Sequence, residues 1–206
     1  MTVPTVRVAI AGSTGSIGRQ TLDVVHAENQ AARDGRSENP VHYEITGLSA
    51  GSSVEALIAQ ARQVGARRVA IADVSQHGAV RDALPGVDVV ASQCDLIDDA
   101  DVVVNGVVGC AGLDVTLETL RQGKRLALAN KESLIAAGPI VQPLRRTKGA
   151  EIIPVDSEHC AIHQCLRSSV RLDVEVSALV LTASGGPFRT RSSDELATVT
   201  VHQALA

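Results

Sequence analysis

Short runs of almost continuously apolar residues alternate with longer amphipathic stretches from the start of the chain to Val155. Strands of this kind are typical of a parallel sheet with helices on both faces, and their alternation with helices indicates βαβ units. The pattern predicts an α/β fold built on a doubly wound parallel sheet. We expect strands over residues 6–11, 43–48, 68–72, 87–90, 101–104, 125–129 and 151–155, and helices over 16–26, 54–64, 113–121 and from 131 onward.

The alternation weakens beyond Val155. We expect a helix over residues 160–166, a strand over 178–182 and a turn into a short helix near Asp194. The remaining residues are too few to bury an independent core of ordinary size. We therefore expect a first domain over residues 1–155 and an incomplete second domain over 156–206. The polar stretch 27–40 is interpreted as a surface loop.

The composition excludes several classes of function. Among 206 residues, 19 Lys and Arg face 23 Asp and Glu, so no basic excess indicates binding to nucleic acid or to an anionic membrane. Aromatic residues make up 1% of the chain, which excludes a stacking surface for single-stranded nucleic acid. No apolar run is long enough to span a bilayer and the start lacks the features of a secretory signal, so we expect a cytoplasmic protein. We expect four free thiols in or near the core, at Cys94, Cys110, Cys160 and Cys165.

Three glycines, Gly12, Gly15 and Gly18, directly follow the first expected strand and open the first expected helix. Glycine permits positive φ in a tight turn, and a bare backbone lets a pyrophosphate approach the free N–H groups at the positive end of the helix. The spacing G-x-x-G-x-x-G differs from the commonest dinucleotide fingerprint, G-x-G-x-x-G. The position between strand and helix favours a Rossmann-like dinucleotide site over the alternative, a glycine-rich turn that binds nothing.

Gly51, Ser52 and Ser53 follow the second expected strand, at the end that faces the adenine ribose in dinucleotide-binding folds. An acidic residue there would hold the ribose 2′-hydroxyl of NAD, and this motif contains none. The serine hydroxyls can hydrogen-bond a 2′-phosphate instead, so we expect NADP. The alternative is a turn of small residues that leads into the next helix.

Asn130, Lys131 and Glu132 lie at the carboxyl end of another expected strand, where open α/β sheets bind ligands. Lys131 can anchor an anionic or hydroxylated substrate at this position. The same residues suit an ordinary helix start, with Asn130 as the cap and Glu132 favourable in the first turn. The spacing leaves both interpretations open.

Asp156 and Glu158 follow the last expected strand of the first domain. They point to one side if the backbone stays extended, and adjacent carboxylates repel unless a cation or a proton lies between them. Oxygen ligands suit a hard ion such as Mg²⁺ or Mn²⁺. The alternatives are a solvated acidic loop and, with less support, a zinc site that includes His159 and His163.

Four stretches together resemble the 1-deoxy-D-xylulose 5-phosphate reductoisomerase family, in that family's order and spacing: AGSTGSIGRQTLDVV, LALANKESLIAAG, IIPVDSEH and LTASGGPFR. The resemblance implies an enzyme of isoprenoid biosynthesis that rearranges 1-deoxy-D-xylulose 5-phosphate on Mg²⁺ or Mn²⁺. It then reduces the resulting aldehyde with NADPH to give 2-C-methyl-D-erythritol 4-phosphate. It also implies that the protein forms a homodimer and binds a small phosphorylated sugar as its substrate. It implies binding to neither nucleic acid nor a membrane.

The resemblance assigns roles to residues by their positions in these motifs. The cofactor-binding residues that it implies are Thr14, Gly15, Ser16, Ile17, Gly51, Ser52, Ser53, Asn130 and Glu132. The implied substrate-binding residues are Lys131, Ser157, Glu158 and Ser184, the metal ligands are Asp156 and Glu158, and the catalytic residues are Lys131, Asp156 and Glu158.

The chain departs from the family pattern in two respects. Some members carry a lysine where Ser52 stands, which bears on the preference for NADPH over NADH. Members are also longer. In the family pattern the mobile flap, a third metal carboxylate and a C-terminal helical domain follow the position that corresponds to Ala206. We therefore expect a truncated chain that turns over substrate slowly or not at all. The alternatives are a semialdehyde-dehydrogenase-type oxidoreductase, which needs an activated cysteine, and a non-catalytic nucleotide-binding domain.

Overall fold

The computed structural model describes residues 3–182 and 186–204, and the chain divides into two compact units, Met1–Asp156 and Ser157–Ala206. The first unit contains seven strands: β1 (Thr5–Ala11), β2 (His42–Ala50), β3 (Arg68–Ile71), β4 (Asp88–Val90), β5 (Val102–Asn105), β6 (Arg125–Leu128) and β7 (Glu151–Pro154). They form one sheet in the order β4-β3-β2-β1-β5-β6-β7, and every neighbouring pair is parallel. The predicted parallel α/β fold is confirmed.

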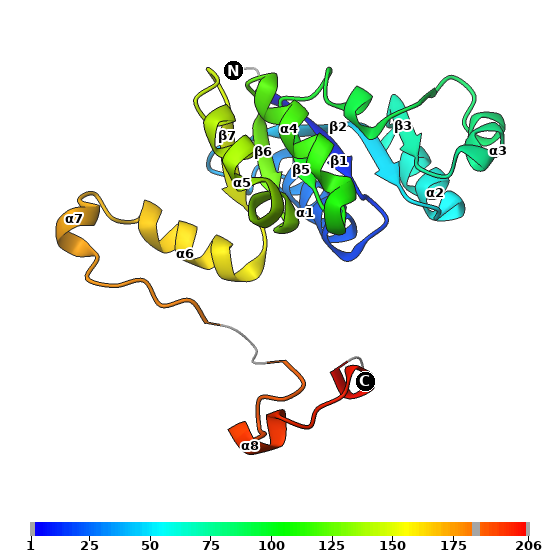
Figure 1. The fold of residues 1–206 in the computed structure, drawn as a ribbon. Coiled ribbons are helices and arrows are strands. Elements are labelled where there is room, and N and C mark those ends of the chain that lie inside the picture. Colours follow the sequence, from blue (N-terminus) through cyan, green and yellow to red (C-terminus); the bar gives the residue numbers. More distant parts are fainter. Residues whose placement is uncertain (1–2, 183–185, 205–206) are drawn as a thin grey trace. The chain divides into compact units, whose positions relative to one another are not determined.

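The helices of the first unit connect these strands: α1 (Ser16–Arg33), α2 (Val54–Val64), α3 (His77–Ala83), α4 (Leu113–Arg121) and α5 (Glu132–Leu144). Short 3₁₀ turns lie at η1 (Val74–Gln76), η2 (Gln93–Leu96) and η3 (Gly109–Gly112). In Figure 1, α2 and α3 lie near β3, whereas α4 and α5 lie beside β5, β6 and β7. The strand order reverses at β1, and right-handed connections that run in opposite directions put helices on opposite faces of a sheet.

Alternate residues of β1 show both covered faces. Val8 and Ile10 belong to the apolar cluster that includes the helices α1, α2 and α3, whereas Ala9 and Ala11 belong to the cluster that includes α4. All four side chains are buried, as period-two alternation requires of a strand covered on both faces. This central strand therefore holds its carboxyl end, where the glycines follow, in a fixed position within the core.

The first helix is longer than the sequence predicts. It runs to Arg33, so the interpretation of residues 27–40 as a surface loop is wrong for the first part of that stretch. The side chain of Asn29 donates to the carbonyl of Tyr43 and accepts from its N–H, both at 2.8 Å, and this pair of bonds holds the polar end of α1 against β2. The helix stops before Gly35, which takes the left-handed φ of +68°.

The second unit is helical where it is described, with α6 (Ser157–Arg167), α7 (Leu172–Glu175), α8 (Ser193–Leu196) and α9 (Val201–Ala204). The helix predicted over residues 160–166 and the turn into a helix near Asp194 are confirmed. The strand predicted over 178–182 is wrong, because this segment pairs with no strand in the described part of the chain. A lone strand cannot satisfy its backbone hydrogen bonds, whatever its apolar content.

Within residues 3–182 and 186–204, no helix combines the length and the apolar character needed to cross a membrane.

Candidate functional site

The carboxyl ends of all seven parallel strands meet at one edge of the sheet, called here the carboxyl edge. Three of the predicted motifs follow strands at this edge: residues 12–18, called the glycine loop, after β1, residues 51–53 after β2, and residues 130–132 after β6. Asp156 follows β7 in the same way. The fold therefore brings motifs that are far apart in the sequence to one side of the molecule.

The three glycines of the glycine loop differ in whether the surrounding structure could accommodate a side chain in their place. Gly12 has φ +78°, and a β-carbon there would lie 3.0 Å from the backbone of Gly106. A β-carbon on Gly18 would lie less than 3.0 Å from backbone atoms of Ser13 and Gly12. A β-carbon on Gly15 would meet only one atom, the carbonyl oxygen of Gly12 at 3.4 Å. Packing within the chain thus explains Gly12 and Gly18 but leaves Gly15 bare toward the outside.

Gly15 is also the N-cap of α1, a helix of 18 residues. No side chain caps this helix end, and its first turn contains no acidic residue. Uncapped N–H groups at the positive end of a long helix favour an anion. Gly15 and Ser16 are exposed here, while Thr14 and Ile17 are partly buried beside them. These four predicted residues therefore fit a pyrophosphate, and the bare position of Gly15 leaves room for it.

The glycine loop is held by residues that the sequence analysis missed. The N–H of Gly12 donates to the hydroxyl of Ser49 at 3.1 Å, and the N–H of Ser13 donates to the Ser49 carbonyl at 2.7 Å. The buried hydroxyl of Ser13 donates to Gln60 Oε1 at 2.8 Å, and Gln60 Nε2 donates to the Ser13 carbonyl at 3.0 Å. The loop is thus tied to the end of β2 and to α2. No pattern used in the sequence analysis indicated this support, because Ser49 and Gln60 are brought to the loop only by the fold.

Gly51, Ser52 and Ser53 are exposed at the carboxyl end of β2. Ser53 is the N-cap of α2, and its side chain makes no capping hydrogen bond. A β-carbon on Gly51 would meet no atom within 4 Å. The segment therefore offers two accessible hydroxyls next to a helix N-terminus, which fits an anionic substituent on a ribose.

The motif after β6 contains three polar residues, of which Asn130 is buried, Glu132 is partly buried and Lys131 is exposed. Asn130 is 2% exposed, and its Nδ2 donates to the carbonyls of Val107 and Gly109 and to Glu132 Oε2 at 2.7, 2.8 and 3.2 Å. Its Oδ1 accepts from the N–H of Ser133 at 3.0 Å, in the first turn of α5. The side chain of Asn130 is thus fully used inside the protein. Its backbone N–H donates to the carbonyl of Asn105 at 3.2 Å, so a bound cofactor can meet only its backbone carbonyl.

Lys131 is exposed, and its Nζ lies 3.3 Å from Oδ1 of Asp156. The Asp156 side chain is 13% exposed, whereas that of Lys131 is 44% exposed. A carboxylate with so little solvent is stabilised by a cation beside it. The electrostatics at Asp156 therefore favour a positive charge, which fits the predicted metal ligand.

Asp156 and Glu158 would point to one side if the backbone stayed extended, and this condition is not met, because α6 begins at Ser157 and places Glu158 in its first turn. Glu158 also belongs to the second unit. Among the residues that the structure describes, no group of three His, Cys, Asp or Glu side chains forms a metal site, so the zinc alternative at His159 and His163 gains no support. Ser184 lies outside the described residues.

The dimensions of the sheet separate the two ends of this site. Asp156 and the glycine loop follow β7 and β1, which are separated in the sheet by β5 and β6. Three strand spacings amount to about 14 Å. A dinucleotide whose pyrophosphate meets the glycine loop must therefore extend over β5 and β6 to bring its reactive ring near Asp156.

The charged residues that stabilise the sheet lie away from the carboxyl edge. Arg7, at the start of β1, forms hydrogen bonds to both carboxylate oxygens of Asp101, at 3.1 and 2.6 Å, and these bonds lower the pKa of Asp101. Burial lowers the pKa of Lys124. Arg7 lies near the start of β1, and Asp101 and Lys124 directly precede β5 and β6, so all three lie at the opposite edge of the sheet.

The four cysteines are free thiols, as predicted, but the expected position in or near the core is wrong for Cys110 and Cys165, which are exposed. Burial raises the pKa of the Cys94 thiol, which makes its thiolate less available. An activated cysteine nucleophile needs a lowered pKa, so Cys94 does not support the semialdehyde-dehydrogenase alternative.

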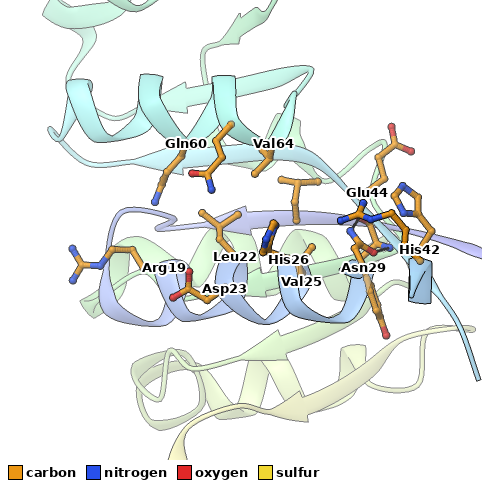
Figure 2. A pocket seen from close by; sticks show the side chains of 14 residues that line it. Arg19, Leu22, Asp23, Val25, His26, Asn29, His42, Glu44, Gln60 and Val64 are labelled. Atoms are coloured by element: carbon orange, nitrogen blue, oxygen red, sulfur yellow. Dashed lines mark hydrogen bonds between the residues drawn. The ribbon is translucent and has the colours of Figure 1, made fainter. Parts of the chain in front are cut away.

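A groove of about 530 Å³ lies between α1 and α2, where His26 and Val64 are among its lining residues, and the first residues of β2 complete its lining (Figure 2). Of the predicted site residues that the structure describes, none lines this groove. It is open and lined by mixed polar and apolar side chains, so it is distinct from the carboxyl-edge site.

Comparisons with known proteins agree with this geometry. Residues 8–138 match the family model of 1-deoxy-D-xylulose 5-phosphate reductoisomerase, and residues 152–206 match the model of its C-terminal domain. The reductoisomerase of Mycolicibacterium smegmatis is 48% identical over 202 residues, which cover 96% of this chain and 46% of that protein. The chain spans about half the length of the curated relatives that it matches.

Solved structures give the same result. The reductoisomerase from Zymomonas mobilis in complex with NADPH superimposes with a TM-score of 0.78 at 38% identity, over 98% of this chain and 51% of that one. A reductoisomerase in complex with NADPH, fosmidomycin and magnesium gives a TM-score of 0.76 at 30% identity, over 97% and 50%. The strand order, the glycine loop and the family-model match together show that this chain belongs to the 1-deoxy-D-xylulose 5-phosphate reductoisomerase family.

Proposed function

We propose that this chain is the NADPH- and metal-binding part of an enzyme that rearranges 1-deoxy-D-xylulose 5-phosphate and reduces the product to 2-C-methyl-D-erythritol 4-phosphate. The observation that carries the proposal is the shared edge of the sheet, where the glycine loop, Lys131 and Asp156 all follow parallel strands. Family membership supports it, as do the NADPH, fosmidomycin and magnesium named for the solved relatives.

In this proposal the cofactor lies along the carboxyl edge. The N–H groups of Thr14, Ser16 and Ile17 hold the pyrophosphate at the start of α1. Gly15 lies beside it without a side chain, since its own N–H donates to the Gly12 carbonyl, and Gly51, Ser52 and Ser53 hold the 2′-phosphate. Asn130 contributes its backbone carbonyl, because its side chain and its N–H are bonded inside the protein, and Glu132 lies beside it. NADPH, when bound, supplies the hydride for the reduction.

Asp156 and Glu158 are the proposed ligands of a divalent ion, with Ser157, Lys131 and Ser184 as substrate contacts. The fit at Asp156 rests on its low exposure and on the cation that lies beside it. A divalent ion bound there supplies Lewis-acid polarisation of the substrate oxygens. Lys131 holds a positive charge at the same place and orients the anionic or hydroxylated substrate.

The first domain, residues 1–155, is proposed as the NADPH-binding domain, and residues 156–206 as the beginning of the catalytic domain. A homodimer and a cytoplasmic location belong to the same proposal, since the family resemblance implies them. Sedimentation of the full-length protein and fractionation of its source cells measure these two properties.

Isothermal titration of the 206-residue chain tests the cofactor and metal sites separately. We expect NADPH to bind more tightly than NADH. We also expect the unaltered chain to bind Mn²⁺ and the Asp156→Asn variant to lose this affinity. The Asp101→Asn chain is the matched control, because Asp101 lies at the opposite edge and its loss should leave Mn²⁺ binding unchanged. Mn²⁺ binding that Asp156→Asn does not change would overturn the metal assignment.

Turnover separates this proposal from a non-catalytic nucleotide-binding domain. The chain covers half of its relatives, so we expect it to turn over substrate slowly or not at all. Joined to the remainder of a reductoisomerase, it should support conversion of 1-deoxy-D-xylulose 5-phosphate with oxidation of NADPH. A joined protein that binds NADPH and Mn²⁺ but never turns over would support the non-catalytic alternative.

A further inference from the structure

Four buried polar side chains lie behind the proposed cofactor site: Asn105 at the end of β5, Thr116 in α4, and Asn130 and Ser133 around the start of α5. Each is at most 2% exposed. Burial of polar groups is costly unless they are hydrogen-bonded, so a set of this kind is retained where it fixes one arrangement. No role is assigned to Thr116, Ser133 or Asn105 by the resemblance, although Ser133 lies within one of its motifs.

The hydrogen bonds among these side chains run in one direction. Asn105 Nδ2 donates to the hydroxyl of Thr116 at 3.0 Å, and Thr116 donates to the hydroxyl of Ser133 at 3.1 Å. Ser133 donates in turn to Oδ1 of Asn130. A chain in which each hydroxyl both accepts and donates is mutually strengthened by polarisation. Loss of one member therefore weakens the others.

The chain closes on the backbone of Val107. The N–H of Val107 donates to Asn105 Oδ1 at 3.2 Å, and the carbonyl of Val107 accepts from Asn130 Nδ2 at 2.7 Å. Asn130 also donates to the carbonyl of Gly109 at 2.8 Å. We call this closed set of Asn105, Thr116, Ser133, Asn130 and the Val107 backbone the polar ring. It holds residues 107–109 at both polar atoms of Val107 and at one atom of Gly109.

The segment held by the polar ring lies against the glycine loop. The N–H of Gly106 donates to the carbonyl of Ala11 at 2.9 Å, and a β-carbon on Gly106 would lie 3.3 Å from the side chain of Ile17. Val108, between the two carbonyls that Asn130 holds, is 84% exposed. The segment after β5 thus presents an apolar side chain outward, next to the start of α1 and over the strands that a dinucleotide must cross.

We propose that the polar ring is a positioning device that fixes residues 106–109 as the support for the nicotinamide half of NADPH. This inference rests on the proposed function. The adenosine half is expected at the carboxyl end of β2, and β2 lies on the other side of β1 from β5 and β6. The residues of the polar ring make no contact with that end of β2. A rigid support lowers the cost of ordering the protein when the ligand binds. Loosening the ring should therefore weaken NADPH without weakening a ligand that carries only the adenosine half.

Two threonines of α4 provide a matched pair of variants. Thr116 and Thr119 are both 0% exposed, and Thr→Val removes a hydroxyl at nearly constant shape. Thr116→Val breaks the polar ring, whereas Thr119→Val removes a bond from its hydroxyl to the carbonyl of Val115 within the same helix, at 2.6 Å. The ligands are NADPH and adenosine 2′,5′-bisphosphate, whose dissociation constants are measured for the whole 206-residue chain.

We expect Thr116→Val to weaken NADPH about three- to tenfold, the range for one buried hydrogen bond, and to leave adenosine 2′,5′-bisphosphate unchanged. Thr119→Val should leave both constants unchanged. Hydrogen exchange gives a second readout, because the Val107 N–H should exchange faster in Thr116→Val alone. If Thr116→Val does not fold, Ser133→Ala is measured against the same expectations.

Two other results overturn the inference. A Thr116→Val chain that loses affinity for both ligands equally has only a structural defect, and one that loses affinity for neither has no positioning role. In both cases the unaltered chain still binds NADPH, so the proposed function survives. An unaltered chain that binds neither ligand refutes the cofactor assignment itself and the inference with it.

Discussion

Gly18→Ala is the perturbation for which the structure gives the clearest magnitude. Gly18 is buried in the first turn of α1, and a β-carbon there would lie under 3.0 Å from the Cα and carbonyl oxygen of Ser13 and from the carbonyl oxygen of Gly12. All three atoms belong to the backbone of the glycine loop, which cannot rotate away as a side chain would. The helix and the loop must therefore move apart.

The expected free-energy change combines two opposing effects. Alanine stabilises a helix interior by roughly 1 kcal/mol relative to glycine. Overpacking in a close-packed core costs about 1–3 kcal/mol, and three simultaneous backbone clashes belong at the upper end of that range. We therefore expect Gly18→Ala to lower the free energy of unfolding by about 2 kcal/mol. NADPH binding should weaken as well, because the displaced loop forms the proposed pyrophosphate site.

Two other glycines separate packing from ligand binding. A β-carbon on Gly78, in α3, would meet no atom within 4 Å, so Gly78→Ala should raise the free energy of unfolding by about 0.5–1 kcal/mol. Gly15→Ala meets one carbonyl oxygen at 3.4 Å and has an ordinary φ of −73°. It should fold with nearly unchanged stability and still lose NADPH affinity, since its methyl group would project into the proposed anion site.

Urea unfolding followed by far-UV circular dichroism is the assay, because the chain has no Trp and one Tyr and so offers little fluorescence signal. Fluorescence of the bound NADPH itself reports the affinity of each folded variant. A Gly18→Ala chain as stable as the unaltered protein would refute the packing argument. A Gly15→Ala chain with full NADPH affinity would refute the assignment of the helix end as the pyrophosphate site.

Two further predictions concern charged pairs. The hydrogen bonds from Arg7 lower the pKa of Asp101, so their stabilisation is present above the unfolded-state pKa of about 4 and is lost as pH falls through the lower folded-state pKa. Asp101→Asn should therefore be less stable than the unaltered chain in urea at pH 7, with a smaller difference at pH 3; a difference that grows on acidification contradicts this. Lys131→Met removes the ammonium group that lies 3.3 Å from Asp156, so Mn²⁺ no longer competes with the lysine for the Asp156 carboxylate. An electron-paramagnetic-resonance titration should show tighter Mn²⁺ binding than in Lys131→Arg, and equal or weaker binding would speak against an overlap of the two cations.

The periodic elements of the first unit were predictable because burial on two faces imposes a strong pattern. The predicted helices over residues 54–64 and 113–121 coincide with α2 and α4, and the predicted strand over 125–129 differs from β6 by one residue at its end. Each of these elements packs its apolar residues into the core and stops at a glycine or polar turn. In these elements the local sequence pattern and the burial in the folded protein agree, so the pattern alone is enough to predict the element.

Prediction failed where contacts outside the local pattern decide the structure. The end of α1 is polar, and the helix continues because Asn29 bonds to β2 through both ends of its amide. Residues 178–182 have the composition of a strand, but strand formation needs a neighbour, and the described part of the chain supplies none. Neither contact can be read from the segment itself.

The candidate site shows the same division more sharply. The motif of three glycines predicts a phosphate loop as a whole, yet Gly12 and Gly18 are required by backbone contacts that would exist in a chain that binds nothing. A β-carbon on Gly15 would meet the backbone only at an ordinary 3.4 Å, so among the three glycines Gly15 carries the information about a ligand. Asn130 is the converse case, since its motif suggests a cofactor contact while its side chain is consumed inside the polar ring. A motif residue therefore supports a binding site only to the extent that the packing of the chain leaves its presence unexplained.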